Sequence, residues 1–201
     1  MKPSTIGLIF AALLFSGCGK RATIEALNDS SVVLAFGDSL TFGYGASEDS
    51  SYPVVLAKLI GVQVVNAGVP GEDSSAALRR LPASLEAHQA DLVILCTGGN
   101  DMLQKQSQAK LKSNLTAMVD LIQQAGADVM IVAVPAPGIM LKVPNLYAEV
   151  AQEQHLPYEG DVIKEVLSDA SLKSDLVHPN EEGYRRMAEA FAALIKRSEL
   201  K

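Results

Sequence analysis

The sequence predicts a three-layer α/β/α sandwich built on a mostly parallel, five-stranded sheet. Three continuous apolar runs, at residues 31–36, 91–97 and 128–134, are typical of strands that are buried on both faces. Residues 62–66 form a shorter run of the same kind, and helical stretches separate the four runs. Alternation of strands and helices with short connections indicates an α/β fold, and no linker divides the chain.

Amphipathic patterns predict the helices. Hydrophobic residues recur at helical spacing in three stretches between the strands, residues 52–60, 74–88 and 110–125. Pro82 predicts a break in the second stretch, because proline inside a helix removes a hydrogen bond and clashes with the preceding turn. The clearest helix follows Pro179, which suits a first helical turn. Residues 143–167 predict two further short helices and a weak fifth strand near residues 156–158.

The first residues differ in composition from the rest of the chain. A basic residue, Lys2, precedes an apolar run over residues 6–15 that only Gly7 interrupts. As a helix this run spans about 15 Å, half of a bilayer core, which favours a signal peptide over a membrane-spanning helix. The small residues just before Cys18 resemble the lipobox of bacterial lipoproteins, in which the cysteine is lipidated.

The lipobox resemblance implies a domain plan and a location. Residues 1–17 are then a lipoprotein-type signal peptide, residues 18–30 a tether and residues 31–201 one domain. Gly19 implies that the protein is not retained at the inner membrane, so we expect a periplasm-facing lipoprotein of the outer membrane. The alternative is an ordinary secretory signal, which predicts a soluble periplasmic or secreted protein.

Composition bounds the classes of function. The formal net charge is -6, and the body of the chain has no Lys/Arg cluster, which excludes an electrostatic nucleic-acid footprint. Cys96 is the remaining cysteine of the body, so no internal disulfide is expected, and its apolar surroundings predict a buried, inert thiol. No His, Asp and Glu residues have zinc-site spacing, so we expect neither a catalytic metal nor a cofactor.

Four polar blocks carry the candidate chemistry, three after strands and one before the last helix. They are Gly37-Asp38-Ser39-Leu40, Asn66-Ala67-Gly68, Gly98-Gly99-Asn100-Asp101 and Asp175-Leu176-Val177-His178-Pro179-Asn180. In open parallel sheets, reactive groups gather beyond the carboxyl ends of the strands. Each block alone is a common turn or cap, and it is their combination that predicts an active site.

The residue types in these blocks suit acyl transfer. A serine hydroxyl such as that of Ser39 needs a base, which His178 can supply near neutral pH. Asp175, three residues earlier, can hold the other ring nitrogen of that histidine. The backbone N–H groups of Ser39 and Gly68 and the side-chain amide of Asn100 can converge as an oxyanion hole.

The four blocks, in this order, resemble those of the SGNH (GDSL) hydrolases. Four longer runs are similar to bacterial multifunctional acyl-CoA thioesterase/lysophospholipase and arylesterase enzymes, and the similarity covers roughly residues 32–196. The runs are residues 37–45, residues 64–71, Arg80-Leu81-Pro82 and residues 178–180. The resemblance implies a flavodoxin-like fold, a triad of Ser39, Asp175 and His178, and an oxyanion hole of Ser39, Gly68 and Asn100.

The substrate is less well defined by the sequence. Apolar residues within 135–146 follow the fourth strand and either line an acyl or aryl groove or pack onto the neighbouring helix. With the resemblance, we expect an ester substrate: an acyl thioester, an aryl ester or a lysophospholipid. The alternatives are a carbohydrate O-acetyl esterase, against which the absence of tryptophan argues, and a lipid-anchored binding protein without activity.

Overall fold

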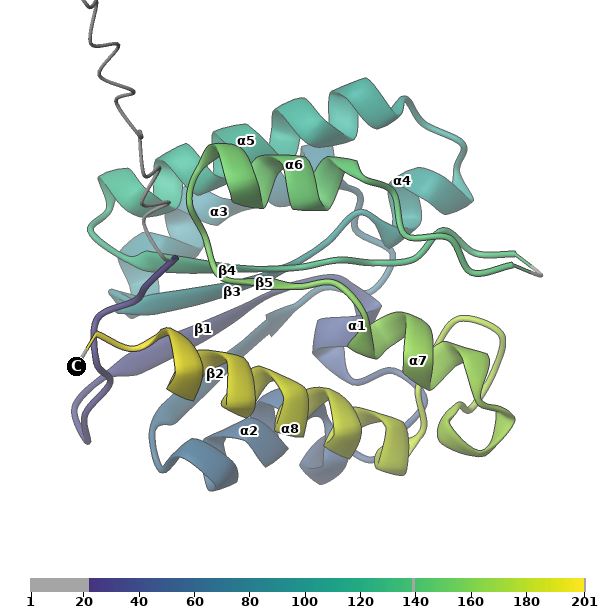
Figure 1. Cartoon of the computed structure of the whole chain (residues 1–201), viewed down its shortest axis with the longest axis horizontal. Coiled ribbons are helices and arrows are strands. Elements are labelled where there is room, and N and C mark those ends of the chain that lie inside the picture. The colour runs from purple at the N-terminus through teal and green to yellow at the C-terminus, as the bar shows by residue number, and fades with distance from the viewer. Residues whose placement is uncertain (1–21, 139, 201) are drawn as a thin grey trace, which may run out of the picture.

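The structure, a computed structural model, describes residues 22–138 and 140–200, and within them it forms the predicted α/β/α sandwich (Figure 1). Five parallel strands of these residues pair in the order β2-β1-β3-β4-β5. The strands are β1 (Val32–Gly37), β2 (Gln63–Gly68), β3 (Leu92–Cys96), β4 (Asp128–Val132) and β5 (Tyr158–Glu159). The expected signal peptide, residues 1–17, and Cys18 lie outside the described residues.

Helices cover both faces of the sheet (Figure 1). One face carries α3 (Ser74–His88), α4 (Gly99–Leu103), α5 (Gln108–Gln124) and α6 (Leu146–Glu153). The other carries α1 (Ser39–Phe42), α2 (Tyr52–Ile60), α7 (Val162–Ser168) and α8 (Glu181–Ser198). Two 3₁₀ turns, Glu48–Ser50 and Ala170–Leu172, complete the chain's regular elements within the described ranges. None of the helices described is long and apolar enough to cross a membrane.

The core lies between these layers, and three buried tyrosines link it to the loops around the carboxyl ends of the strands. Tyr147 donates a hydrogen bond from its hydroxyl to the backbone oxygen of Thr97, directly after β3, at 2.9 Å. The Tyr184 hydroxyl donates to the backbone oxygen of Tyr44 at 2.8 Å. The Tyr52 hydroxyl lies 3.0 Å from that of Thr41 in α1. The packed helices therefore fix the loops from which the polar blocks project.

Two helices differ from the expectation. α3 continues through Pro82, because Ala77, Leu81 and Leu85 bury one continuous apolar face on both sides of the exposed proline. α8 begins at Glu181 rather than at the earlier proline, since the Asn180 side chain accepts a hydrogen bond from the N–H of Gly183 at 3.0 Å and caps the helix.

The described part of the expected tether is also held to the domain. Ile24 is buried, its N–H donates to the Ser198 backbone oxygen at 3.0 Å, and its own backbone oxygen accepts from Leu200 at 2.9 Å. The N–H of Glu25 donates to the Asp128 carboxylate at 2.6 Å. Residues 24 and 25 therefore pack against the end of α8 and the start of β4.

The strand order sets the position of the polar blocks. β1 lies between β2 and β3, and the chain leaves β1 toward one face and β3 toward the other (Figure 1). Such a reversal leaves a crevice at the carboxyl ends of the two central strands. Residues that follow β1, β2 and β3 therefore meet at one end of the sheet.

Candidate active site

Ser39 stands at the start of a tight turn directly after β1. The Asp38 carboxylate accepts a hydrogen bond from the N–H of Leu40 at 3.0 Å and so caps the short helix α1 that Ser39 begins. Gly37 is required just before this turn, because a Cβ at this position would lie 2.1 Å from the backbone oxygen of Cys96. Close contact between β1 and β3 therefore fixes where the Ser39 hydroxyl points.

His178 and Asp175 complete a hydrogen-bonded row with Ser39. The Nε2 atom of His178 lies 3.0 Å from the Ser39 hydroxyl oxygen, and its Nδ1 atom lies 2.8 Å from a carboxylate oxygen of Asp175. The other carboxylate oxygen of Asp175 accepts from the N–H groups of Val177 and His178 at 2.8 and 2.9 Å. The loop before α8 thus positions a carboxylate, an imidazole and a hydroxyl in the order that nucleophilic catalysis by serine requires.

The surroundings of the row keep the carboxyl group of Asp175 ionised. Burial alone would raise the pKa of Asp175, but the hydrogen bonds from His178 and from the N–H of Val177 outweigh it and hold that pKa below its usual range. The ring of Tyr44 lies against the imidazole, with the centroids 4.6 Å apart. The side chain of His178 is 16% exposed, so water has limited access to the ring.

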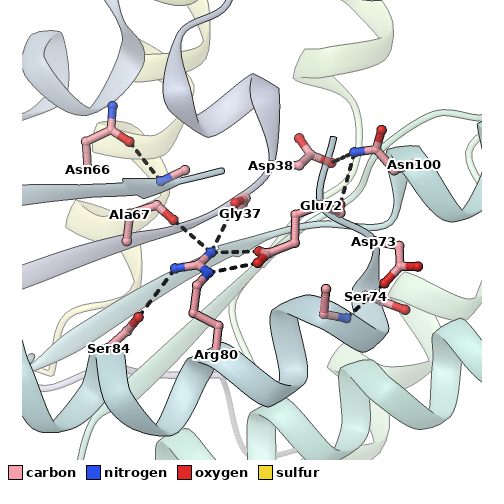
Figure 2. A network of polar contacts seen from close by, with 12 residues as sticks. Gly37, Asp38, Asn66, Ala67, Glu72, Asp73, Ser74, Arg80, Ser84 and Asn100 are labelled. Atoms are coloured by element: carbon pink, nitrogen blue, oxygen red, sulfur yellow. Dashed lines mark hydrogen bonds and ion pairs between the residues drawn. The ribbon is translucent and has the colours of Figure 1, made fainter. Parts of the chain in front are cut away.

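Asn100 lies in α4, just after β3, and its side chain meets Asp38, the residue before Ser39 (Figure 2). Its side-chain Nδ2 donates to the backbone oxygen of Glu72 at 3.0 Å and lies 3.4 Å from the carboxylate of Asp38. Burial raises the pKa of Asp38 to about 6, with the N–H of Leu40 partly opposing the shift. The amide of Asn100 is therefore anchored through one N–H, while its second contact is long enough to be exchanged for a ligand oxygen.

The structure does not bring Gly68 to this site as the sequence analysis expects. The N–H of Gly68 donates to the Asn66 side chain at 3.0 Å (Figure 2), and Gly68 does not line the cavity next to Ser39. A Cβ at Gly68 would lie 2.1 Å from the backbone nitrogen of Phe42, so this glycine serves the contact between β2 and α1. Tight packing accounts for this glycine.

Gly71, three residues after Gly68, does reach the cavity. It lines the cavity together with Ser39 and Asn100, and its φ of 79° is the left-handed value that the third residue of a type II turn needs. The hydrogen bond of that turn runs from the N–H of Glu72 to the backbone oxygen of Val69 at 3.2 Å. The turn therefore does not use the N–H of Gly71 itself.

An apolar cavity of about 270 Å³ opens beside Ser39 and His178. Its leucine and valine side chains are Leu40, Leu103, Val134, Leu141, Leu167 and Val177. A second hollow of about 570 Å³ shares several of these residues and extends outward as far as Lys173. Within residues 135–146, Leu141 therefore lines the cavity and Leu146 is buried in α6, whereas Met140 is exposed and Ile139 lies outside the described residues.

Comparison with known proteins identifies the family. The model of the GDSL-like lipase/acylhydrolase family matches residues 35–186, the greater part of the chain, including every polar block described above. The chain belongs to this family. Membership confirms the resemblance to the SGNH (GDSL) hydrolases and makes the chain a serine ester hydrolase.

The relatives of this GDSL hydrolase carry related names. An arylesterase from Vibrio mimicus is 29% identical over 174 residues, which cover 81% of this chain and 87% of that protein. The thioesterase 1/protease 1/lysophospholipase L1 of Escherichia coli K12 is 28% identical over 172 residues, with 82% and 83% covered. A crystal structure of TesA matches with a TM-score of 0.74 at 25% identity and covers 83% of this chain and 99% of that one.

The sequence reasoning misses two features of this GDSL hydrolase, the position of Gly71 at the cavity and an ion pair of Arg80. The sequence contains a signal for the first, since the pair Pro70-Gly71 is typical of a type II turn with glycine at a positive φ. The second is the pairing of Arg80 with Glu72 beneath the site, which the sequence does not reveal, because it joins a helix to a loop. Among the residues the structure describes, no three His, Cys, Asp or Glu side chains are grouped as a metal site.

Proposed function

We propose that this hydrolase cleaves carboxylic esters and thioesters through an acyl-serine intermediate. The Ser39 oxygen attacks the substrate carbonyl carbon while His178 Nε2 accepts the hydroxyl proton, and Asp175 holds the protonated imidazole. His178 then gives that proton to the leaving alcohol or thiol, and the carbonyl–heteroatom bond breaks. Water, deprotonated by the same nitrogen, releases the acid. The hydrogen-bonded row at the mouth of an apolar cavity is the observation that supports this mechanism.

The negative oxygen of the tetrahedral intermediate needs donors, and we assign three. They are the backbone N–H groups of Ser39 and Gly71 and the Nδ2 of Asn100, all from residues that line the cavity. The assignment replaces Gly68 by Gly71, because the N–H of Gly68 is bonded to Asn66. Donors of this kind act on charge that develops in the transition state, so they increase turnover more than they increase substrate affinity.

The cavity walls favour an apolar acyl or aryl group over a sugar. The inner cavity of about 270 Å³ is lined mainly by aliphatic side chains, and the outer hollow continues it past Leu103, Leu141 and Leu167. An acyl chain that leaves water for such a surface gains about 0.8 kcal/mol for each buried methylene. The names of the relatives, arylesterase and thioesterase/lysophospholipase, agree with a substrate of this class.

A panel of para-nitrophenyl esters from acetyl to palmitoyl, together with acetylated xylan, tests the substrate class. We expect kcat/KM to rise from the acetyl to the octanoyl ester, by up to about fourfold for each methylene that is buried. Leu103→Ser should reduce this preference, whereas Leu59→Ser should not. The two leucines are 52% and 50% exposed, but Leu59 lies on α2, away from the cavity. A highest kcat/KM on acetylated xylan would instead support the carbohydrate O-acetyl esterase.

For the cellular location we propose a lipid-anchored protein of the bacterial envelope that faces the periplasm. The support is the sequence alone: the short apolar run over residues 6–15 and the small residues before Cys18. Cys18→Ser should move the protein from the membrane fraction to the soluble fraction. The substitution removes the thiol and with it the lipidation site, and stable anchoring takes two or more acyl chains. An unmodified Cys18 in the mass spectrum of the native protein would contradict the anchor.

A further inference from the structure

Arg80 lies on α3 and contacts the carboxyl ends of β1 and β2 and the loop that follows β2 (Figure 2). Its Nε and Nη2 atoms donate to the two carboxylate oxygens of Glu72 at 2.9 and 2.7 Å. The same Nη2 donates to the backbone oxygen of Ala67 at 3.1 Å and lies 3.5 Å from that of Gly37. The guanidinium also stacks over the ring of Phe36, 4.1 Å from its centroid.

Two of the contacted residues, Gly37 and Glu72, lie close in sequence to proposed oxyanion donors. Gly37 stands two residues before Ser39, and its position sets the turn that presents the Ser39 N–H. Glu72 directly follows Gly71, so holding its side chain limits how the Gly71 peptide can rotate. The backbone oxygen of Glu72 accepts the hydrogen bond that anchors Asn100. A single guanidinium therefore connects the segments that carry all three donors.

Burial makes this connection rigid. The Glu72 side chain is 7% exposed and that of Arg80 is 26% exposed, so water has little access to the hydrogen bonds between them. Without Arg80, the buried carboxylate of Glu72 would have no partner, which costs much free energy. The ion pair therefore holds the loop that carries Glu72 against α3. The planar fork of arginine fixes direction as well as distance, which the single ammonium of a lysine does not.

We propose that Arg80, through its ion pair with Glu72, is a positioning residue for the oxyanion hole. It touches no substrate, and it acts by keeping the Gly71 N–H and the Asn100 amide aimed at the carbonyl oxygen of the ester. The inference rests on the proposed function, since it concerns the donors assigned there. Displacing an aligned group by about 1 Å can lower a rate by about 10²-fold. Deleting a donor outright costs about 10²- to 10³-fold.

The test compares Arg80→Met with Arg79→Met, the adjacent and exposed arginine on the same helix. Using para-nitrophenyl octanoate, we expect Arg80→Met to lower kcat by about 10- to 100-fold and to change KM by less than about threefold. Arg79→Met should stay within about twofold of the wild type, as expected for a surface change. Arg80→Lys should fall between wild type and Arg80→Met, because it restores charge without the fork.

A second readout does not depend on turnover. In ¹⁵N-labelled protein, the signals of the Gly71 backbone N–H and of the Asn100 side-chain amide should shift or broaden in Arg80→Met and stay in place in Arg79→Met. Glu72→Gln, which keeps the backbone oxygen and changes one charge, provides the same comparison if Arg80→Met does not fold.

The inference requires both changes. A folded Arg80→Met protein with unchanged kcat, or with both signals in place, would overturn it, whatever the melting temperature. A wild-type protein that hydrolyses none of the esters would instead refute the proposed function, and the two signals would still decide whether Arg80 positions the donors.

Discussion

Ser39→Ala should lower kcat toward para-nitrophenyl esters by about 10⁴- to 10⁶-fold, because the covalent route disappears with the hydroxyl. The fold should persist, because the hydroxyl of Ser39 bonds to the side chain of His178 and does not cap α1. The Asp38 side chain provides that cap. Initial rates and a thermal melt measure the two effects separately. The matched control is Ser47→Ala, whose exposed hydroxyl bonds Glu181 at 2.8 Å and lies outside the cavity. Activity within tenfold of the wild type in Ser39→Ala would rule out Ser39 as the nucleophile.

Asp175→Asn should have the second largest effect, a loss of about 10³- to 10⁴-fold in kcat. Asparagine keeps an oxygen for the N–H groups of Val177 and His178, so the turn before α8 can remain folded. It can place an amide N–H, instead of a carboxylate oxygen, against Nδ1 of His178, which favours the wrong tautomer for accepting the serine proton.

Asp169→Asn is the control for that change. Asp169 is also an acid at the start of a turn, it accepts from the N–H of Ser171 at 2.8 Å, and it does not line the cavity. Its replacement should leave kcat within about twofold of the wild type, the range of an ordinary surface change. If Asp175→Asn retained a tenth of the wild-type kcat, the imidazole would not depend on this carboxylate.

Most of the sheet could be predicted because its signal is local. Strands β1, β3 and β4 are buried on both faces, and their continuous apolar runs reflect this directly. The helices α1 and α4 were not expected, because they are too short to show periodicity and depend on caps at the strand ends.

The candidate site was predictable where its chemistry is tied to residue type. Ser39, Asp175 and His178 lie together as the four blocks predict, since each follows a strand or precedes the last helix. The role of Gly68 could not be predicted in this way, because a glycine can either present its N–H to a ligand or allow two backbones to pack closely. Only the positions of Phe42 and Asn66 in the structure show that Gly68 does the second.

Contacts between separate elements of the fold could not be predicted from the sequence. Arg80 meets Glu72, Ala67 and Gly37 because α3 packs beside the carboxyl ends of β1 and β2. The docking of Ile24 beside α8 is of the same kind, since it joins segments that are more than 170 residues apart in the sequence. No local pattern of charge or hydrophobicity distinguishes such contacts from solvent-exposed residues.

Covalent trapping tests the central claim most directly. The protein is incubated with a fluorophosphonate, which phosphonylates an activated serine, and the digested peptides are analysed by mass spectrometry. We predict one adduct per chain, on the Ser39 hydroxyl, and none in Ser39→Ala. An adduct on another serine, or no adduct on a protein that still hydrolyses the para-nitrophenyl esters, would contradict the acyl-serine mechanism.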